Sequence, residues 1–266
     1  SSDLLRALPV ITLANVITGN ARSNTIDGKD GTDTASYAAA TVGVTVSLAA
    51  AGAQVTGAGS DTLVSIENLT GSVHNDRLTG NSGANRLDGG LGNDTLTGGA
   101  GTDTYVANSS ADVVVEAGPS YEIDRVIAGV NWTLQSTLEN LTLSGSANLT
   151  GGGNSRANLI TGNGGNNTLR GYGGNDTLDG GLGSDTLYGS SGSDTYVTNV
   201  ATDVIVEDGT DTTEIDTVIA GVNWTLQSTL ENLTLSGSGN LIGSGNTRAN
   251  VITGNGGHNL LRGDAG

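Results

Sequence analysis

The sequence predicts an all-β chain folded as a parallel β-solenoid, and three observations lead to this fold class. Glycine opens successive nine-residue units at two places in the chain, namely at Gly71, Gly80, Gly89 and Gly98 and at Gly153, Gly162, Gly171, Gly180 and Gly189. The better units read Gly-Gly-x-Gly-x-Asp-x-Leu-x, a nonapeptide period typical of parallel β-helices. Helix signals are absent, and long copies recur every 91 to 92 residues, so we expect short strands stacked into a solenoid.

Composition supports a periodic chain with a thin core. The 266 residues include 44 Gly and two Pro, with no Cys, Met or Phe, and only 3% are aromatic. Leu, Ile and Val recur at fixed steps between the glycines, which argues against disorder. The net charge of −17, from 27 acids and 10 bases, disfavours nucleic acid and anionic membrane as partners and favours bound cations, although an acidic surface also serves solubility alone. The absence of Cys excludes disulfides and thiolate metal sites.

The ends of the chain indicate a piece of a larger polypeptide. The N-terminal SSDLLRALPV has no basic region followed by a long apolar stretch, so we expect no signal peptide in this segment. No apolar run approaches the ~20 residues of a membrane span. The chain stops at Gly266, part-way through a nonapeptide.

Two periods divide the chain into six segments. The 18 residues GVNWTLQSTLENLTLSGS occur identically from Gly129 and from Gly221, and one residue is inserted between Gly118 and Glu122 relative to the second copy. The inserts continue the stack with longer rungs or form a small separate β unit. The segments are a divergent repeat block with a strand insert (1–70), a repeat block (71–106), a β insert (107–152), a second block (153–197), a second insert (198–244) and the start of a third block (245–266).

The repeated acid has the chemistry of a calcium ligand. In the unit Gly89–Thr97, glycines permit a tight turn with φ > 0, Asp94 supplies a carboxylate, and Leu96 begins a short strand pointing inward. Calcium takes six to eight oxygen ligands from carboxylates and carbonyls. Two stacked carboxylates ~4 Å apart repel by about 4 kcal/mol at an effective dielectric near 20, and a divalent cation reverses that sign. We therefore expect several Ca²⁺ ions whose binding drives folding, with metal-free glycine-rich β-structure as the alternative.

These units resemble the hemolysin-type calcium-binding repeat family, also called RTX repeats. The resemblance implies a right-handed parallel β-roll with two nonapeptides per turn and calcium held between turns stacked on one side. It pairs Asp76 with Asp94, Asn85 with Asp103, Asn167 with Asp185 and Asp176 with Asp194. The implied metal-site residues are Asp33, Asp76, Asp94, Asp103, Asp176, Asp185, Asp194, Gly90, Gly92, Gly99, Gly101, Gly174, Gly181, Gly183 and Gly192.

Two features leave the ion count open. The sixth position is asparagine in Asn15, Asn24, Asn85, Asn158, Asn167, Asn250 and Asn259. An amide oxygen ligates more weakly than a carboxylate, or the amides form a cation-free ladder, so each block starts metal-poor and ends metal-rich. A second acidic group lies in the inserts, either as solvated turn acids or as extra calcium sites: Asp203, Glu207, Asp208, Asp211, Glu214 and Asp216, echoed by Asp112, Glu116, Glu122 and Asp124.

No catalytic residue is predicted. The chain lacks H-E-x-x-H and G-x-S-x-G, so the segment is expected not to be an enzyme. His74 and His258 fall in turns, and Trp132 and Trp224 lie in strand-like copies that favour the core over ligand stacking.

The resemblance implies a secreted or cell-surface bacterial protein, exported unfolded and folded outside by calcium. This segment is then a folding, spacer or assembly module, with calcium as partner and with itself or neighbouring surface domains as further partners. One alternative is the calcium-binding tail of an exported lipase, protease or polysaccharide-modifying enzyme. Another is an ice- or glycan-binding module, for which outward threonine rows are the only sign.

Overall fold

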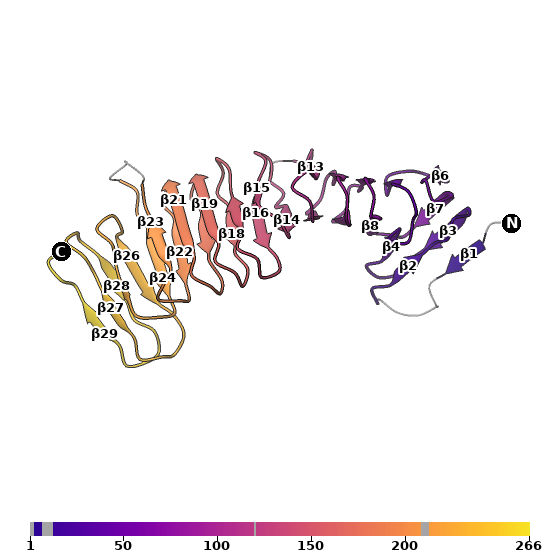
Figure 1. Ribbon diagram of the computed structural model, residues 1–266. Coiled ribbons are helices and arrows are strands. Elements are labelled where there is room, and N and C mark those ends of the chain that lie inside the picture. Colours follow the sequence, from indigo (N-terminus) through magenta and orange to yellow (C-terminus); the bar gives the residue numbers. More distant parts are fainter. Residues whose placement is uncertain (1–2, 7–12, 120, 209–212) are drawn as a thin grey trace. The chain divides into compact units, whose positions relative to one another are not determined.

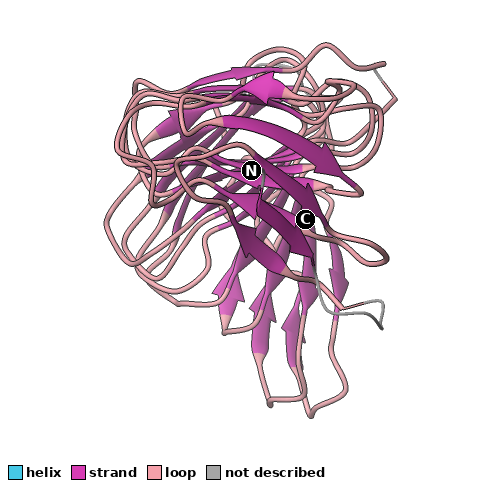
Figure 2. Ribbon diagram, turned by 90° about the vertical axis from the view of Figure 1, so that its right-hand side faces the viewer, coloured by secondary structure: helices cyan, strands magenta, loops and turns pink. Residues whose placement is uncertain are grey.

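The structure is a computed structural model that describes residues 3–6, 13–119, 121–208 and 213–266. Its regular structure in these residues is entirely β-strand (Figure 2). The chain divides into two compact units, Ser1–Val130 and Asn131–Gly266. No helix capable of crossing a membrane occurs within the described ranges.

The first unit consists of short strands joined by turns. Its described strands are β1 (Asp3–Arg6), β2 (Val16–Thr18), β3 (Asn24–Asp27), β4 (Thr34–Ser36), β5 (Thr45–Ser47), β6 (Gln54–Val55), β7 (Ser60–Val64), β8 (Asn68–Thr70), β9 (Arg77–Thr79), β10 (Arg86–Asp88), β11 (Thr95–Thr97), β12 (Thr104–Ala107), β13 (Val113–Val115) and β14 (Arg125–Ala128).

The second unit repeats this pattern, and its strands lie side by side as successive rungs (Figure 1). They are β15 (Trp132–Thr133), β16 (Asn140–Leu143), β17 (Thr150–Gly152), β18 (Leu159–Thr161), β19 (Thr168–Gly173), β20 (Thr177–Asp179), β21 (Thr186–Ser191), β22 (Thr195–Thr198), β23 (Val204–Val206), β24 (Thr217–Ala220), β25 (Trp224–Thr225), β26 (Asn232–Leu235), β27 (Ile242–Ser244), β28 (Val251–Thr253) and β29 (Leu260–Arg262).

Outside the β6–β7 hairpin, successive strands belong to different sheets. In the first unit the hydrogen-bonded orders are β2-β4-β8-β10-β12-β14, β13-β11-β9-β5 and β1-β3-β7-β6. In the second unit they are β16-β18-β20-β22-β24-β26-β28, β15-β17-β19-β21-β23 and β25-β27-β29. The described pairings are parallel except for the hairpin of β6 with β7. Each turn of the coil therefore takes two nonapeptides, and the expected all-β parallel solenoid is confirmed.

The core is one residue deep on each side, because each three-residue strand points one side chain inward. That residue is the eighth of each nonapeptide, and it is fully buried in Leu78, Leu87, Leu96, Tyr105, Ile160, Leu169, Leu178, Leu187 and Tyr196. Its neighbours on either side are partly or fully exposed in most strands, as in the i-B-i pattern of β11 and β20.

The inserts continue the stack. β13 pairs with β11 and β14 pairs with β12, while in the second unit β23 pairs with β21 and β24 with β22. The rung length changes instead: equivalent residues are 18 apart within the repeat blocks but 21 or 22 apart where a block enters an insert. Trp132 and Trp224 are buried, as the sequence favours.

Candidate metal sites

The sixth-position aspartates form ladders along the turns. Asp94 is 1% exposed. Its Oδ1 accepts a 2.8 Å hydrogen bond from the backbone N–H of Asp76, one turn earlier. The N–H of Asp94 in turn donates to Oδ1 of Asp112 at 2.9 Å. Each aspartate therefore joins two rungs through one of its two oxygens.

The same bond recurs in the divergent block and in the blocks 71–106 and 153–197. The backbone N–H of Asn15 donates to Oδ1 of Asp33 at 2.8 Å. Four further pairs of N–H donor and Oδ1 acceptor have a distance of 2.7 Å: Asn85 and Asp103, Asn158 and Asp176, Asn167 and Asp185, and Asp176 and Asp194. The four same-side pairs implied by the family resemblance are thus adjacent in the structure.

The second oxygen of most of these aspartates has no partner. Buried polar atoms are nearly always hydrogen-bonded, yet the structure leaves Oδ2 buried and without a hydrogen bond in six of the seven predicted aspartates: Asp33, Asp94, Asp103, Asp176, Asp185 and Asp194. An anionic oxygen in that position requires a cation or a proton.

The second residue of the turn decides which carboxylates are left unpaired. In the turn of Asp76, the N–H of Ser72 donates to Oδ2 at 2.5 Å and its hydroxyl donates to Oδ1 at 2.9 Å. In the six turns with an unpaired oxygen, the second residue has a left-handed backbone: Lys29 (φ 68°), Gly90 (84°), Gly99 (111°), Tyr172 (75°), Gly181 (78°) and Ser190 (76°).

That backbone conformation turns the N–H away from the carboxylate. The N–H of Gly90 donates to Asp88 Oδ1 at 3.3 Å and the N–H of Gly181 donates to Asp179 Oδ1 at 3.0 Å, each at the end of the preceding strand. The sixth-position carboxylate then keeps one free oxygen. The left-handed residue therefore builds an anionic site.

Glycines bring carbonyl oxygens close to these turns. A Cβ at Gly90 would lie 2.1 Å from the carbonyl oxygen of Ser72, and one at Gly92 would lie 2.5 Å from that of His74. All eight predicted glycines have positive φ: Gly90, Gly92, Gly99, Gly101, Gly174, Gly181, Gly183 and Gly192. Carboxylate and carbonyl oxygens thus gather around one small volume per turn, as the donor set of calcium requires.

The asparagine turn of Asn158 fills the equivalent position with hydrogen bonds and leaves no unpaired carboxylate oxygen. Oδ1 of Asn158 accepts the N–H of Asn154 at 2.7 Å, while its Nδ2 donates to the carbonyl oxygens of Leu138 at 3.3 Å and Glu139 at 3.0 Å. Nδ2 of Asn154 also donates to Leu138 O at 2.7 Å. Amide hydrogens therefore supply the positive partner that a cation would supply.

We call the six turns with an unpaired Asp Oδ2 the acid turns. In five of them, burial disfavours the charged form of the aspartate. It raises the pKa of Asp94, Asp185 and Asp194 to about 6 and that of Asp103 and Asp176 to about 7. Neighbouring acids add to the shift: Asp112 acts on Asp94, and Glu116 and Asp124 act on Asp103. Without a cation, near-neutral pH leaves these carboxylates between their two protonation states.

The comparison with known families identifies the repeats. The family model of the RTX calcium-binding nonapeptide repeat, four copies long, matches residues 12–37, 70–114, 152–187, 161–196, 173–205 and 242–266. These matches cover more than half of the chain. The chain belongs to the RTX calcium-binding repeat family. No curated protein matches it.

RTX nonapeptide repeats bind Ca²⁺, and the geometry of this RTX chain fits that ion. Unpaired buried carboxylate oxygens, backbone carbonyls and glycine turns without side chains are all hard-oxygen features. When bound, the ion supplies the charge that offsets the stacked carboxylates. The residues that would hold it are the six aspartates with an unpaired Oδ2, together with the glycine turns around them.

The seventh predicted aspartate differs from the others. Both oxygens of Asp76 accept hydrogen bonds, including one from the N–H of Val44 at 2.7 Å. Its part in binding an ion stays a prediction, and its turn lacks the unpaired oxygen that characterises the six. The sequence does not reveal this difference, because Ser72 and Ser190 both occupy the second position of their turns and only Ser190 has a left-handed backbone.

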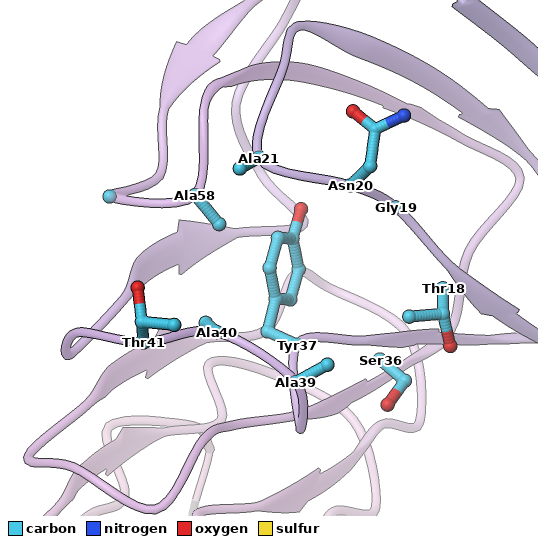
Figure 3. A pocket seen from close by; sticks show the side chains of 11 residues that line it. Thr18, Gly19, Asn20, Ala21, Ser36, Tyr37, Ala39, Ala40, Thr41 and Ala58 are labelled. Atoms are coloured by element: carbon cyan, nitrogen blue, oxygen red, sulfur yellow. The ribbon is translucent and has the colours of Figure 1, made fainter.

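One hollow outside the turns lies in the first unit. Its volume is about 140 Å³, and Figure 3 shows the Tyr37 ring within it, near Ala21 and Ala58. The Tyr37 hydroxyl lies 3.2 Å from Asp61 Oδ2 and donates to it. The lining consists of Gly, Ala, Ser, Thr, Asn and Tyr side chains, so it brings no acid–base pair or nucleophile–base pair together.

Proposed function

We propose that this chain is a calcium-gated folding and spacer segment of a protein that works outside the cell. The observation that carries the proposal is the row of six buried Asp Oδ2 atoms without partners, one per acid turn. Each is an obstacle to folding that calcium removes. The segment thus folds where calcium is abundant and stays open where it is scarce.

The size of the stabilisation follows from the coupling of calcium binding to folding. A ligand that binds only the folded state stabilises it by about 2.7 kcal/mol per site at a hundredfold excess over Kd. Several such sites in series approach the ~5–15 kcal/mol that holds a typical domain together. A few occupied turns therefore suffice to switch the segment between open and folded.

Export supports the same role. RTX repeat proteins are typically secreted by type I secretion, and the calcium-poor interior of a cell would leave a chain with these turns unfolded. The chain has no cysteine and few aromatic residues, so the open form has no thiol to oxidise and few aromatic side chains to aggregate. Assembly or adhesion at a cell surface and the tail of an exported enzyme are two settings for this one physical role.

A calcium titration followed by far-ultraviolet circular dichroism tests the proposal. We expect acid-turn blocks that are mostly coil in chelator and become β-rich by ~0.1–1 mM calcium, the range of extracellular modules. Magnesium should not replace calcium, because it demands a tighter octahedral site and dehydrates reluctantly. A spectrum that is equally β-rich in chelator and in calcium would show that no ion gates the fold.

A further inference from the structure

Carboxylates converge where each repeat block enters its insert. Oxygens of Asp103, Glu116 and Asp124 all lie within 4.8 Å of one another, and those of Asp194, Glu207 and Asp216 do the same. We call these groups the first and second junction clusters. Only Asp103 and Asp194 belong to nonapeptides. The other four acids come from the inserts, outside the repeat motif.

Each junction cluster contains a buried carboxylate oxygen without a partner. Asp103 is 0% exposed and Asp194 is 1% exposed, and Oδ2 of both lacks a hydrogen bond. These atoms point into the clusters: a Cβ at Gly189 would lie 2.2 Å from Asp194 Oδ2 and 2.9 Å from Glu207 Oε2. The two oxygens therefore share the space above that glycine.

Both junction clusters contain the same backbone hydrogen bond, although the segment between donor and acceptor is one residue longer in the second. The N–H of Asp103 donates to Asp124 Oδ1 at 2.7 Å over 21 residues. The N–H of Asp194 donates to Asp216 Oδ1 at 2.8 Å over 22 residues. The one-residue difference falls in the loop that leads to the last acid of each cluster. A chance gathering of surface acids would not reform across that difference.

The protein supplies no cation of its own from the second insert. Residues 198–244 contain seven acids and no lysine, arginine or histidine; Asp211 among those acids lies outside the described residues. The hydroxyl groups of Tyr105 and Tyr196 donate to Glu116 and Glu207. A neutral hydroxyl donor orients one carboxylate but does not offset the negative charge of the three carboxylates in the cluster.

We propose that each junction cluster is a Ca²⁺ site in which two acids of the insert join the aspartate of the last nonapeptide turn, so that the ion closes the repeat block against the following insert. Three carboxylates converge there, whereas the other turns among the described residues bring no three acidic side chains together in this way. Calcium affinity rises with the number of charged ligands. The junction sites therefore fill before the repeat turns as calcium increases.

The test compares Glu207→Gln and the double variant Glu116→Gln/Glu207→Gln with Asp208→Asn. Asp208 is the exposed neighbour of Glu207, so its substitution removes the same charge outside the cluster. Bound calcium is counted by native mass spectrometry, and the rise in Tm on adding calcium is measured in parallel. We expect Glu207→Gln to lose one of the tightest ions, the double variant to lose two, and Asp208→Asn to lose none.

The loss should appear as a binding step weakened by roughly tenfold to a hundredfold, as for removed ligand-supporting groups. A double variant with the wild-type ion count and calcium-induced Tm rise would overturn the proposal. Tyr196→Phe separates binding from packing, because it keeps every carboxylate and removes only the bond to Glu207. If Tyr196→Phe loses as much calcium response as Glu207→Gln, or if Glu207→Gln lowers Tm equally in chelator and calcium, Glu207 acts through packing and the site does not exist.

Discussion

The backbone N–H of Asp176 donates a 2.7 Å hydrogen bond to Oδ1 of Asp194 in the next turn, while Oδ2 of Asp194 is buried without any partner. Oδ1 thus links two rungs by a hydrogen bond, whereas the unpaired charge on Oδ2 destabilises the same turn until a cation binds.

Asparagine at an acid turn should remove calcium dependence locally. Asp185→Asn deletes an unpaired anionic oxygen, so we expect one fewer bound calcium and a smaller calcium-induced rise in Tm. Asp76→Asn should instead destabilise the protein in chelator and in calcium alike, because Val44 and Ser72 direct only donors at its oxygens. Thermal unfolding with and without calcium checks both variants. An equal calcium response for the two would contradict the distinction between their turns.

An amide turn should need two substitutions to become a calcium turn. Asn158→Asp alone places a carboxylate against the carbonyl oxygens of Leu138 and Glu139, so we expect destabilisation that calcium does not repair. Adding Asn154→Gly permits the left-handed second residue and removes a competing amide. Isothermal titration should show an extra calcium site in the double variant only. An extra site in the single variant would refute the role of the second residue.

Acid should substitute for calcium in chelator. The carboxyl pKa values of about 6 for Asp185 and about 7 for Asp176 exceed the ~3.9 of an unfolded aspartate. The folded state therefore holds more protons, and the stability of the calcium-free fold falls as pH rises from about 4 through 7. Circular dichroism in chelator should show more β-structure at pH 4.5 than at pH 8. Calcium should abolish this trend, and a calcium-free fold that gains stability with rising pH would contradict it.

Left-handed residues other than glycine carry a measurable strain. Ser190 has φ of 76° in the second position of its turn, where a side chain costs about 1–2 kcal/mol relative to an unstrained backbone. Ser190→Gly relieves this cost and adds flexibility to the unfolded chain, so we expect a net gain of up to about 1 kcal/mol. Ser190→Val should lose stability, since β-branched residues fit φ > 0 poorly. Denaturant unfolding in calcium measures both changes, and a Ser190→Val variant as stable as wild type would exclude strain at this turn.

The nonapeptide spacing predicts much of this structure, because it fixes both turn and core. Leu96 and Leu178 mark the buried position of each rung, and Asp94 marks the turn carboxylate, as the sequence indicates. The spacing does not distinguish Asp76 from Asp94, because that difference depends on the φ of the second residue. Glycine at that position is a signal, but Lys29, Tyr172 and Ser190 adopt the same conformation without it.

The sequence groups the insert acids of the junction clusters, but it leaves open whether they are solvated turn acids or calcium ligands and does not show which of them meet. Glu116 and Glu207 lie in segments without the nonapeptide period, where turn acids are ordinary surface features. Parallel pairing brings these acids together: β13 on β11 and β23 on β21 place Glu116 and Glu207, while β14 on β12 and β24 on β22 place Asp124 and Asp216.

The alternation of amide and acid turns has a mechanical consequence. Rungs of a solenoid contact only their neighbours, so a pull along the stack passes through every turn in series. The acid turns at Asp176 and Asp194 yield first when their ions leave, whereas the amide turns at Asn158 and Asn250 hold without one. In the proposed spacer role, the surrounding calcium concentration would therefore set the tension at which the segment lengthens, and the amide turns would limit how far it extends.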